Sequence, residues 1–514
     1  MVLNMKVCLI EPPKYVSLTN FVSTISMPPI GMAYIAAAIR ESGHDISVVD
    51  APGLAPRNYY NYKDVVRVRG LTQDEILARI PSDAQVIGLG CMFTSHWVYV
   101  RELVGRIRAS FPDAFLVMGG EHVTGFPEFS LEEAPLDCVV LGEGEETIAQ
   151  LLDHVEKGLP LEDVAGLAYR DDQGDIRVNS RRQRMKDIDA IAKPAWDLFD
   201  IPRYNEVNQP HGSSQGKFIP MLATRGCPFS CTFCTSPNMW TTEWIPRDYK
   251  LVVDEMQEYQ RDYEVSDFQF EDLTAIVRKD WIVGFCDEII GRNMKVTFQL
   301  PSGTRSEGID FEVAQKLKAA GCHEFSFAPE SGDPRILRAI KKKVDLPKMF
   351  ESARSALDAG INVGCFFIIG FPEDTYRSVL KTYGAIIQCA LIGFTNVNLN
   401  AYSPQPNTES FKALQKEGVI KDFDDEYLMS LFTFQDFGAR KTSYNSKFGD
   451  WELSLMVNLG VLIFYIVYFI RKPARIIHLF SDLGSDSSSN KTTKMAKSFF
   501  KDAFTILKNK WIKA

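Results

Sequence analysis

The chain has 514 residues, of which 45% are hydrophobic and 24% are charged. This length exceeds one ordinary domain, and the composition excludes a disordered or low-complexity chain. The net charge of −9 is divided unevenly, because residues 471–514 contain ten Lys and Arg against three Asp and Glu. The acidic remainder argues against a nucleic-acid-binding protein, whereas the basic tail predicts contact with an anionic surface such as a membrane.

The first residues contain no basic segment, long apolar run or cleavage site, so we expect no signal peptide and a cytoplasmic protein. Its ten cysteines are therefore expected to be reduced, and clustered cysteines indicate metal ligands rather than disulfides. Seven scattered cysteines are interpreted as small buried hydrophobic residues: Cys8, Cys91, Cys138, Cys286, Cys322, Cys365 and Cys389.

Residues 1–157 alternate short apolar runs with helical patterns. The runs are rich in Val, Ile and Leu and fall at residues 6–12, 45–50, 85–90, 115–119 and 136–141. Apolar residues recur at helical spacing over 32–39 and 100–107. Alternating strands and helices predict a doubly wound, Rossmann-like parallel sheet, which binds ligands at the carboxyl ends of its strands.

Four loops of this region carry glycine, proline or small polar residues. Glycine allows the backbone to approach a ligand closely. In their order, the loops resemble those of the cobalamin-binding-like domain that precedes the catalytic barrel in one class of radical S-adenosylmethionine (SAM) enzymes. The resemblance implies cobalamin as a cofactor, with these residues near it: Pro29, Gly31, Thr94, Ser95, Gly119, Gly120, His122, Gly142 and Glu143.

One departure concerns the cobalt. Cobalamin domains that ligate cobalt from below use an Asp-x-His-x-x-Gly stretch, which this sequence lacks. His122 lies in the corresponding kind of loop, and we interpret it as a turn or cap residue rather than a ligand. We therefore expect cobalamin without a histidine under its cobalt, and a domain that binds no cobalamin is the alternative.

Residues 158–217 predict a connector with little chemistry in it. Residues 165–170 and 176–178 read as a hairpin closed by a polar glycine turn, and a polar stretch follows.

The most specific motif is Cys-x3-Cys-x2-Cys, formed by Cys227, Cys231 and Cys234 on a loop after a predicted strand. Zinc is the alternative, but no fourth Cys or His lies close in the sequence. Three thiolates suit a [4Fe–4S] cluster with one iron left open, which can chelate the amino and carboxylate groups of SAM. An electron from the cluster, supplied by an external reductant such as flavodoxin or ferredoxin, then cleaves SAM into methionine and a 5′-deoxyadenosyl radical.

Residues 218–410 contain further strand–helix alternation. Strands are predicted at 221–224, 268–270, 296–300, 324–327, 364–369 and 396–401, which fits a partial (β/α)6 TIM barrel with its chemistry at the carboxyl ends. Together with Phe233 before the last cysteine, the strand ends resemble those of radical SAM enzymes. The resemblance implies contacts with the SAM amino group (Glu271, Asp272), its carboxylate (Arg305), its ribose or carboxylate (Glu330, Ser331) and its adenine (Gly370, Pro372).

Two helices are expected after the barrel. In the helical region 411–480, residues 453–470 hold no charge and just reach the length of a membrane span. We expect this helix to pack on the protein or lie in a membrane interface rather than to cross. Residues 481–514 predict a Ser-rich linker and a basic amphipathic helix, read as a membrane-surface anchor or as a cover for a barrel groove.

The leading hypothesis is cobalamin-dependent methylation of an unactivated carbon on a small apolar or lipid-like substrate. In that class one SAM yields the radical and a second SAM remethylates cobalamin. The first alternative is a radical oxidase or cyclase that acts on a ring system such as a tetrapyrrole. The second is a non-catalytic SAM- or cobalamin-binding regulator, against which the intact cysteine motif argues. We expect a cytoplasmic enzyme, peripheral to the inner face of the membrane.

Overall fold

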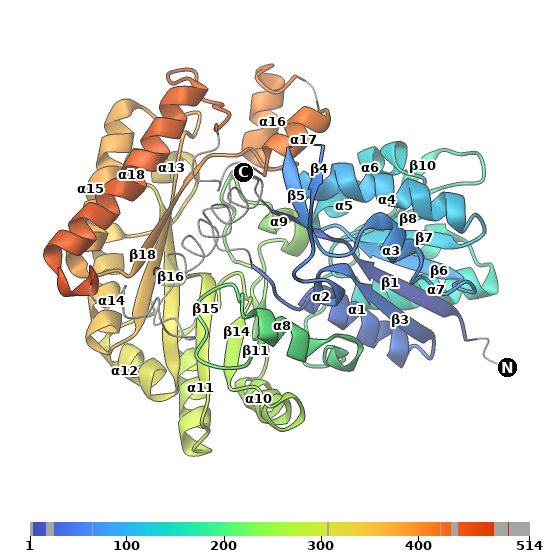
Figure 1. The fold of residues 1–514 in the computed structure, drawn as a ribbon, viewed down its shortest axis with the longest axis horizontal. Coiled ribbons are helices and arrows are strands. Elements are labelled where there is room, and N and C mark those ends of the chain that lie inside the picture. The colour runs from blue at the N-terminus through green and yellow to red at the C-terminus, as the bar shows by residue number, and fades with distance from the viewer. Residues whose placement is uncertain are drawn as a thin grey trace, which may run out of the picture.

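The computed structural model describes residues 4–16, 25–63, 65–305, 308–421, 423–432, 440–476 and Thr492. Two α/β bodies lie side by side, the first domain on the right of Figure 1 and a barrel on its left. The predicted Ser-rich linker and basic helix of 481–514 lie, apart from Thr492, outside the described residues. Both therefore stay predictions.

The first domain is built on a seven-stranded sheet in the order β10-β9-β8-β7-β6-β1-β3. Its parallel strands fall within the five predicted runs: β1 (Lys6–Glu11), β3 (Asp45–Asp50), β6 (Val86–Gly90), β7 (Phe115–Gly119) and β8 (Cys138–Val140). The predicted doubly wound parallel sheet is confirmed. Because β1 lies between β3 and β6, the order of the strands reverses there, and ligands of such sheets bind outside the carboxyl ends at this point.

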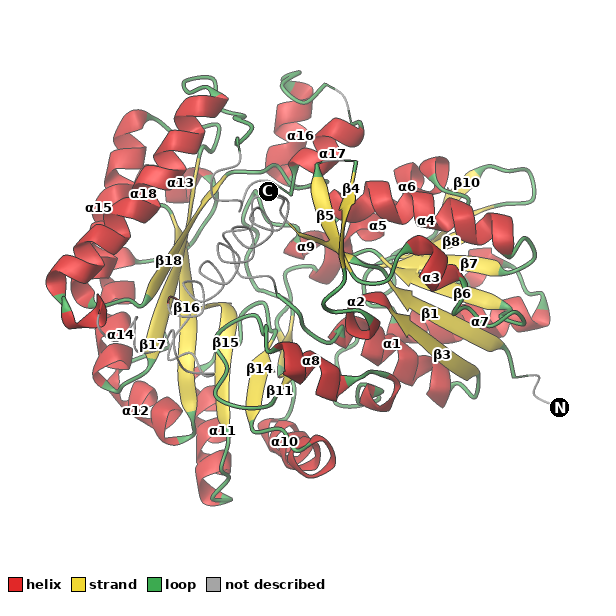
Figure 2. Cartoon of the chain, viewed as in Figure 1, coloured by secondary structure: helices red, strands yellow, loops and turns green. Residues whose placement is uncertain are grey.

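Both faces of this sheet are buried, as expected for strands with continuous apolar runs. Val7 and Leu9 of β1 pack with α1 (Ile30–Glu41) and α7 (Glu145–Lys157), whereas Cys8 and Ile10 pack with α4 (Trp97–Ser110). Helices flank the sheet on both sides in Figure 2. The core on the α1 side continues through the connector into the barrel, so the two bodies share one apolar core.

The predicted hairpin consists of β9 (Leu167–Arg170) and β10 (Ile176–Val178). Its strand β9 pairs antiparallel with β8, so the hairpin extends the first sheet instead of standing in a separate connector. It thereby covers an edge that β8 would otherwise leave open. The first domain also has a small separate sheet that was not predicted. Its strands are antiparallel, in the order β2 (Lys14–Val16), β5 (Val66–Arg69), β4 (Tyr59–Tyr62).

The barrel sheet has six parallel strands in the order β11-β14-β15-β16-β17-β18, which confirms the predicted (β/α)6 barrel. The strands are β11 (Phe218–Met221), β14 (Asp267–Phe270), β15 (Thr297–Thr304), β16 (Cys322–Glu330), β17 (Asn362–Ile369) and β18 (Asn396–Ala401). The first strand was predicted at 221–224, but β11 already ends at Met221, so most of the predicted strand was wrong. Thr224 instead begins β12 (Thr224–Arg225), which pairs with β13 (Ile245–Pro246), because Asp272 accepts the backbone N–H groups of Ala223 and Thr224.

Helices cover the outside of the barrel (Figure 2). They are α10 (Tyr249–Tyr263), α11 (Lys279–Gly291), α12 (Phe311–Ala319), α13 (Pro334–Ala339), α14 (Leu346–Asp358) and α15 (Tyr376–Ile392). Shorter elements complete the chain: α2 (Ala51–Leu54), α3 (Gln73–Leu77), α5 (Glu121–Gly125), α6 (Pro127–Glu133), α8 (Ile201–Val207), α9 (Ser236–Trp240), α16 (Glu409–Lys416) and α17 (Asp425–Ser430), with 3₁₀ turns at Thr94–His96, Leu161–Asp163 and Trp196–Leu198.

The predicted apolar helix is α18 (Asp450–Arg471), which packs on α15 and β18. Gly460 allows this close approach, since a Cβ there would lie 2.3 Å from the Leu399 side chain. The Tyr383 hydroxyl donates to the Met456 carbonyl at 2.6 Å. By length and composition, α18 is the one helix of the described residues that could cross a membrane. It rests on the barrel by one face, as predicted, and leaves the other face exposed.

Candidate active site

The three motif cysteines lie on the loop between β12 and α9, and all three are partly exposed. Burial raises the pKa of the Cys234 thiol to about 12, and Cys227 and Cys231 lie close enough to add to this shift. Within the described ranges, no three His, Cys, Asp or Glu side chains converge on a position for a single metal ion. A [4Fe–4S] cluster does not require such convergence, because its cysteines each bind a different iron.

Glu271 and Asp272 follow β14 but have different roles. Asp272 is buried and accepts hydrogen bonds from the Ala223 N–H at 3.1 Å and the Thr224 hydroxyl at 2.6 Å. Burial raises the pKa of this carboxyl to about 6. Asp272 therefore holds the turn that precedes the cysteine loop, rather than facing SAM as the resemblance implied.

Glu271 retains capacity for a ligand. Its Oε2 lies 3.0 Å from His211 Nδ1, while its buried Oε1 has no hydrogen-bond partner among the described residues. A buried carboxylate oxygen without a partner is costly, and an amino group of SAM would satisfy it. His211 belongs to the connector, for which no chemistry was predicted.

Glu330 lies beside the cysteine loop at the end of β16. Its φ of +67° is unusual for a residue with a side chain, and such backbone strain gathers at functional sites. The buried carboxylate accepts from the half-buried Lys342 ammonium at 2.8 Å. Burial acts to lower the pKa of Lys342, but Glu330 and Cys231 outweigh it and raise that pKa. Lys342 was missed because the run 341–343 resembles ordinary surface charge.

Arg305 points toward the same loop. Its guanidinium lies 4.2 Å from the ring centroid of Phe229, within the cysteine loop, and donates to the Lys343 carbonyl. It also contributes to the electrostatic environment of Cys231. The residue expected to face the SAM carboxylate is thus beside the cysteines.

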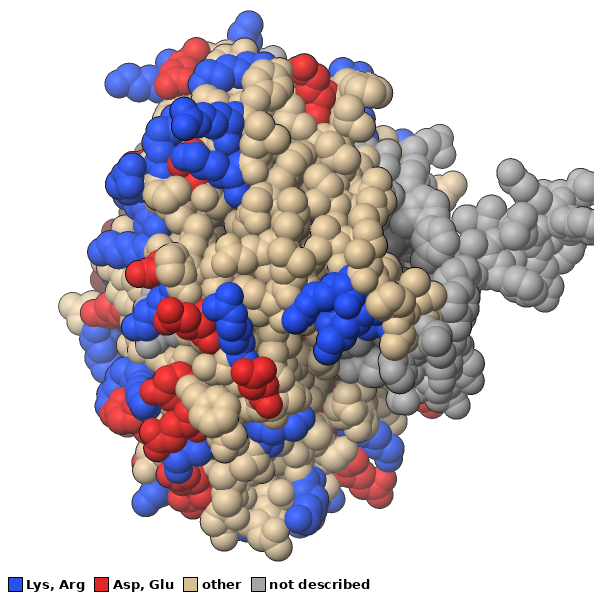
Figure 3. All heavy atoms as spheres, turned by 90° about the vertical axis from the view of Figure 1, so that its left-hand side faces the viewer, with Lys and Arg blue, Asp and Glu red and all other residues tan. Residues whose placement is uncertain are grey.

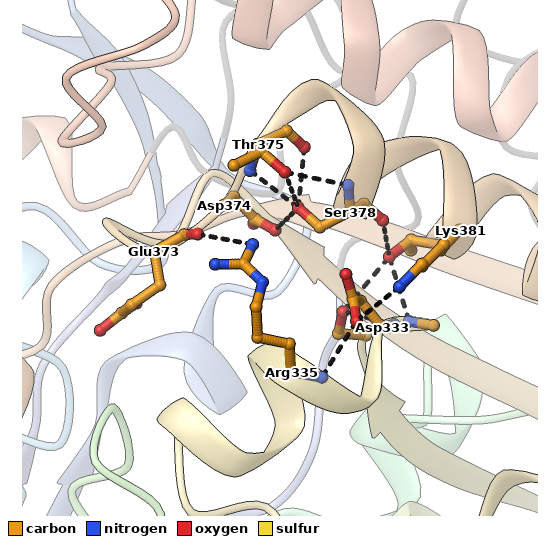
Figure 4. Close-up of polar contacts among 10 residues, drawn as sticks. Asp333, Arg335, Glu373, Asp374, Thr375, Ser378 and Lys381 are labelled. Atoms are coloured by element: carbon orange, nitrogen blue, oxygen red, sulfur yellow. Dashed lines mark hydrogen bonds and ion pairs between the residues drawn. The ribbon is translucent and has the colours of Figure 1, made fainter.

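Side-chain contacts join the turn after β16 to the turn after β17 and to α15 (Figure 4). The Arg335 guanidinium donates to the Glu373 carbonyl at 3.1 Å, and the Lys381 ammonium pairs with Asp333 at 3.0 Å. Ser331 Oγ accepts from the Asp333 N–H at 3.1 Å, so its side chain braces the turn after β16.

The Gly-Phe-Pro turn lies opposite Phe233. Gly370 has a φ of +92° and donates its N–H to Asp374 at 2.9 Å. The Pro372 carbonyl accepts from the Asn445 amide at 3.2 Å. The ring of Phe233 meets that of Phe371 at 5.4 Å, which joins this turn to the cysteine loop.

The glycine-bearing loops of the first domain border the carboxyl ends of β6 and β7. Gly120 has a φ of +118°, and a Cβ there would lie 2.4 Å from the Cys91 carbonyl, so only glycine fits. A Cβ on Gly119 or Gly31 would meet nothing within 4 Å, which leaves open space for a ligand. Pro29 directly precedes α1, and its carbonyl accepts from the Ala33 N–H at 3.0 Å.

Thr94 and Ser95 are buried in the loop after β6, where Thr94 Oγ1 lies 3.1 Å from His122 Nδ1. The His122 ring is fully buried, with its centroid 4.5 Å from that of Trp97. Burial lowers the pKa of His122 to about 3, so the ring is neutral. This side chain packs in an aromatic cluster and caps no helix, in contrast to the predicted turn or cap role. That His122 does not ligate cobalt stays a prediction.

The loop at Gly142 and Glu143 contacts the barrel rather than open space. Glu143 is held by Arg184 and by Arg225 at 3.2 Å, and Arg225 also pairs with Glu145 at 2.6 Å. Arg225 outweighs the effect of burial and holds the pKa of Glu145 below its usual range. Glu143 thus joins the two domains, and its carboxylate is already engaged.

A second contact links the domains at the cysteines. Glu121, after Gly120, is half-buried and lies near Thr235, the residue after Cys234; desolvation raises the pKa of its carboxyl. The helices that follow the two loops, α5 and α9, also touch. The glycine-lined loops therefore face the cysteine loop, an arrangement that defines an enzyme with two cofactor-binding domains.

The comparisons with known proteins agree with this arrangement. The B12 binding domain family matches residues 19–152, and the Radical SAM superfamily matches residues 221–386. An uncharacterized methyltransferase of Pyrococcus horikoshii is 30% identical over 381 residues, covering 74% of this chain and 77% of the relative. The chain therefore belongs to the family of cobalamin-dependent radical SAM enzymes. Its cofactors are a [4Fe–4S] cluster, SAM and cobalamin.

The cobalamin-dependent radical SAM enzyme OxsB, solved with aqua-cobalamin and SAM, shares the fold with a TM-score of 0.70 and 14% identity, covering 98% of this chain and 76% of that chain. Named relatives act on different substrates. They are the cytidylyl-2-hydroxyethylphosphonate methyltransferase of Streptomyces wedmorensis (25% identity; 78% of this chain, 80% of the relative), the anaerobic magnesium-protoporphyrin IX monomethyl ester cyclase of Rubrivivax gelatinosus (26%; 77% and 68%) and the hopanoid C-3 methylase of Methylococcus capsulatus (23%; 82% and 74%).

The different roles of Glu271 and Asp272 can be tested with matched amide variants. We expect Glu271→Gln to weaken SAM binding at least tenfold with little change in melting temperature, since Oε1 has no protein partner. Asp272→Asn should lower the melting temperature, because the turn at Thr224 loses a charged acceptor worth about 1.5–3 kcal/mol. Calorimetry with SAM and thermal melts of both reconstituted variants measure this. Equal SAM affinity in Glu271→Gln and wild type would contradict the assignment.

Proposed function

We propose that the enzyme methylates an unactivated carbon of a small apolar or lipid-like substrate, with Cys227, Cys231 and Cys234 as the cluster ligands. The observation that carries the proposal is the contact of the glycine-lined loops with the cysteine loop, through α5 on α9 and through Glu143 on Arg225. When bound, the cluster and SAM supply a 5′-deoxyadenosyl radical, and cobalamin supplies a methyl group. An unactivated carbon offers no nucleophile for ordinary methylation by SAM, so a fold that brings both cofactors together suits this reaction.

The protein's own groups then bind and orient. Glu271 Oε1 is available to the amino group of SAM, and the Glu330–Lys342 pair places a carboxylate and an ammonium beside Cys231. Gly119 leaves open space for cobalamin beside its Cα. The contacts of α5 with α9 and of Arg225 with Glu143 hold the two loops together, which limits the access of solvent to a radical formed between them.

A radical oxidase or cyclase on a ring system is the second candidate. The relationship to the anaerobic cyclase of Rubrivivax gelatinosus favours it, since that protein covers the same two domains. A non-catalytic regulator is disfavoured, because binding alone requires neither a three-cysteine loop nor an unpaired buried carboxylate at Glu271.

We further propose that the enzyme attaches to an anionic membrane and takes its substrate there. The solvent-facing side of α18, with neighbouring α15, forms a surface with few charged residues (Figure 3). We call it the α18 face; it comprises Trp451, Leu455, Leu459, Leu462, Ile466, Ile470, Leu380 and Leu391. Trp451 is 71% exposed and Ile470 is 73% exposed, at the two ends of the helix.

The charge beside this face favours a bilayer. Arg471, Lys472 and Arg475 follow the apolar stripe at once, and the tail from residue 471 is strongly basic. Each Lys or Arg near an anionic surface contributes about 1 kcal/mol, and burial of a large apolar side chain contributes about 1.5–3 kcal/mol. These terms suffice for reversible attachment. The relationship to a hopanoid methylase gives further support for a lipid-like substrate.

The function is tested by anaerobic incubation of the reconstituted enzyme with SAM, reductant, cobalamin and lipid extracts. We expect 5′-deoxyadenosine and a product heavier by one methyl group. Cys227→Ala, Cys231→Ala or Cys234→Ala should each abolish iron–sulfur absorbance and 5′-deoxyadenosine, whereas Cys322→Ala should keep both. A product changed by hydrogen or oxygen alone would support the cyclase or oxidase reading, and full activity in a motif variant would exclude the proposal.

Attachment is tested by co-sedimentation of the full chain with anionic phosphatidylserine vesicles. We expect Leu455→Ser/Leu462→Ser to reduce the bound fraction severalfold relative to wild type. The matched control, Leu251→Ser/Phe311→Ser, removes exposed apolar side chains from α10 and α12 and should bind as wild type does. High salt should weaken binding further, because it screens the basic tail. No binding, or equal binding by both variants, would refute the membrane proposal.

A further inference from the structure

A basic pocket lies on the surface beside the cysteine loop. Its volume is about 930 Å³, with Pro228, Phe229 and Ser230 of that loop forming one wall. The other wall is the segment 334–347, which comprises α13 and the turn into α14. This pocket was not predicted, because its two walls are distant in the sequence.

The turn after α13 touches the cysteine loop at Cys231, one of the proposed cluster ligands. Cys231 Sγ lies 4.0 Å from the Lys341 carbonyl, and the Thr232 N–H donates to the Ile340 carbonyl at 3.1 Å. Only the thickness of one loop therefore separates the pocket from the cluster site. Since electron transfer through protein slows steeply with distance, this is a short entry route for an electron.

The pocket is positively charged, although the chain as a whole carries −9. Its lining includes Arg338, Lys341, Lys342 and Lys343 against a single acidic residue, Asp345. Lys342 is turned inward to Glu330, and Lys341 pairs with Glu409. Arg338 and Lys343 are exposed, and in the described part of the chain neither forms an ion pair.

The opposite side of the cysteine loop is closed to a macromolecule. There the first domain packs against it through α5, which contacts α9, and through the Arg225 ion pairs with Glu143 and Glu145. A protein that delivers electrons to the cluster must therefore approach from another side, and the basic pocket offers both access and charge.

We propose that this pocket docks an acidic one-electron carrier protein whose redox group is a flavin or an iron–sulfur cluster. The proposal rests on the proposed function, because it requires a cluster at Cys227, Cys231 and Cys234. The carrier loses one electron and the cluster gains it, with no transfer of atoms. Arg338 and Lys343 steer the acidic carrier, and the cysteine loop receives the electron.

The test compares two reductants on the full-length, reconstituted enzyme, with 5′-deoxyadenosine formation from SAM as the readout. One is a reduced acidic flavodoxin with its reductase, and the other is dithionite, which needs no docking surface. The variant is Arg338→Glu/Lys343→Glu. The matched control is Lys295→Glu/Lys318→Glu, whose residues precede β15 and end α12, near the amino ends of the barrel strands and away from the cysteines.

We expect the pocket variant to raise the KM for flavodoxin about tenfold or more at low salt, while its rate with dithionite stays within about twofold of wild type. Added salt should raise the wild-type KM as well. The control variant should keep the wild-type KM. The neutral pair Arg338→Gln/Lys343→Gln, with its iron content measured, controls for disturbance of the loop by charge reversal. It should give a smaller rise in the KM for flavodoxin.

An unchanged KM for flavodoxin in both pocket variants would overturn the proposal. An equal loss with both reductants in the iron-replete neutral variant would also overturn it, since the residues would then be structural. Absence of 5′-deoxyadenosine from wild type with dithionite would instead contradict the proposed function, so the two failures are distinguishable.

Discussion

The buried ion pairs of Arg225 with Glu143 and Glu145 are the constraint on which the arrangement of the site depends. All three side chains are almost fully buried, and removing one partner from such a network typically costs about 3–5 kcal/mol. Arg225 stands two residues before Cys227, whereas Glu143 lies in the loop after β8 and Glu145 begins α7 in the first domain. The network therefore fixes the cysteine loop against the domain that binds cobalamin.

The predicted site residues divide into those that build this frame and those left available to ligands. Asp272, Ser331 and Glu143 use their polar groups in protein contacts. His122 packs its ring against Trp97 and keeps a buried Nε2 without a partner among the described residues. Glu271 has one carboxylate oxygen without a hydrogen-bond partner among the described residues, and a Cβ built on Gly119 would meet only open space. Functional residues of both kinds gather at the same strand ends, which is why a sequence motif alone does not separate them.

Local patterns in the sequence were sufficient for the main elements. The parallel strands of both sheets appear in the sequence as short apolar runs. The three motif cysteines fall within eight residues, and their spacing alone predicts the cluster. The first barrel strand was misplaced because its end depends on Asp272, which is 48 residues from the backbone of Thr224. Arg225, Glu121 and Lys342 were missed for the same reason, since each acquires its role from a partner in another part of the chain. The exposed side of α18 likewise depends on which side rests on β18.

The most direct test of the facing arrangement uses the magnetic coupling between the two cofactors. In the reduced holoenzyme, both the [4Fe–4S] cluster and Co(II) cobalamin carry unpaired electrons, and electron paramagnetic resonance reports their mutual dipolar interaction. We expect the reduced cluster to broaden the Co(II) signal and to speed its relaxation, and Arg225→Leu to weaken both effects. A Co(II) signal identical with and without the reduced cluster would contradict the placement of the two cofactors on facing loops.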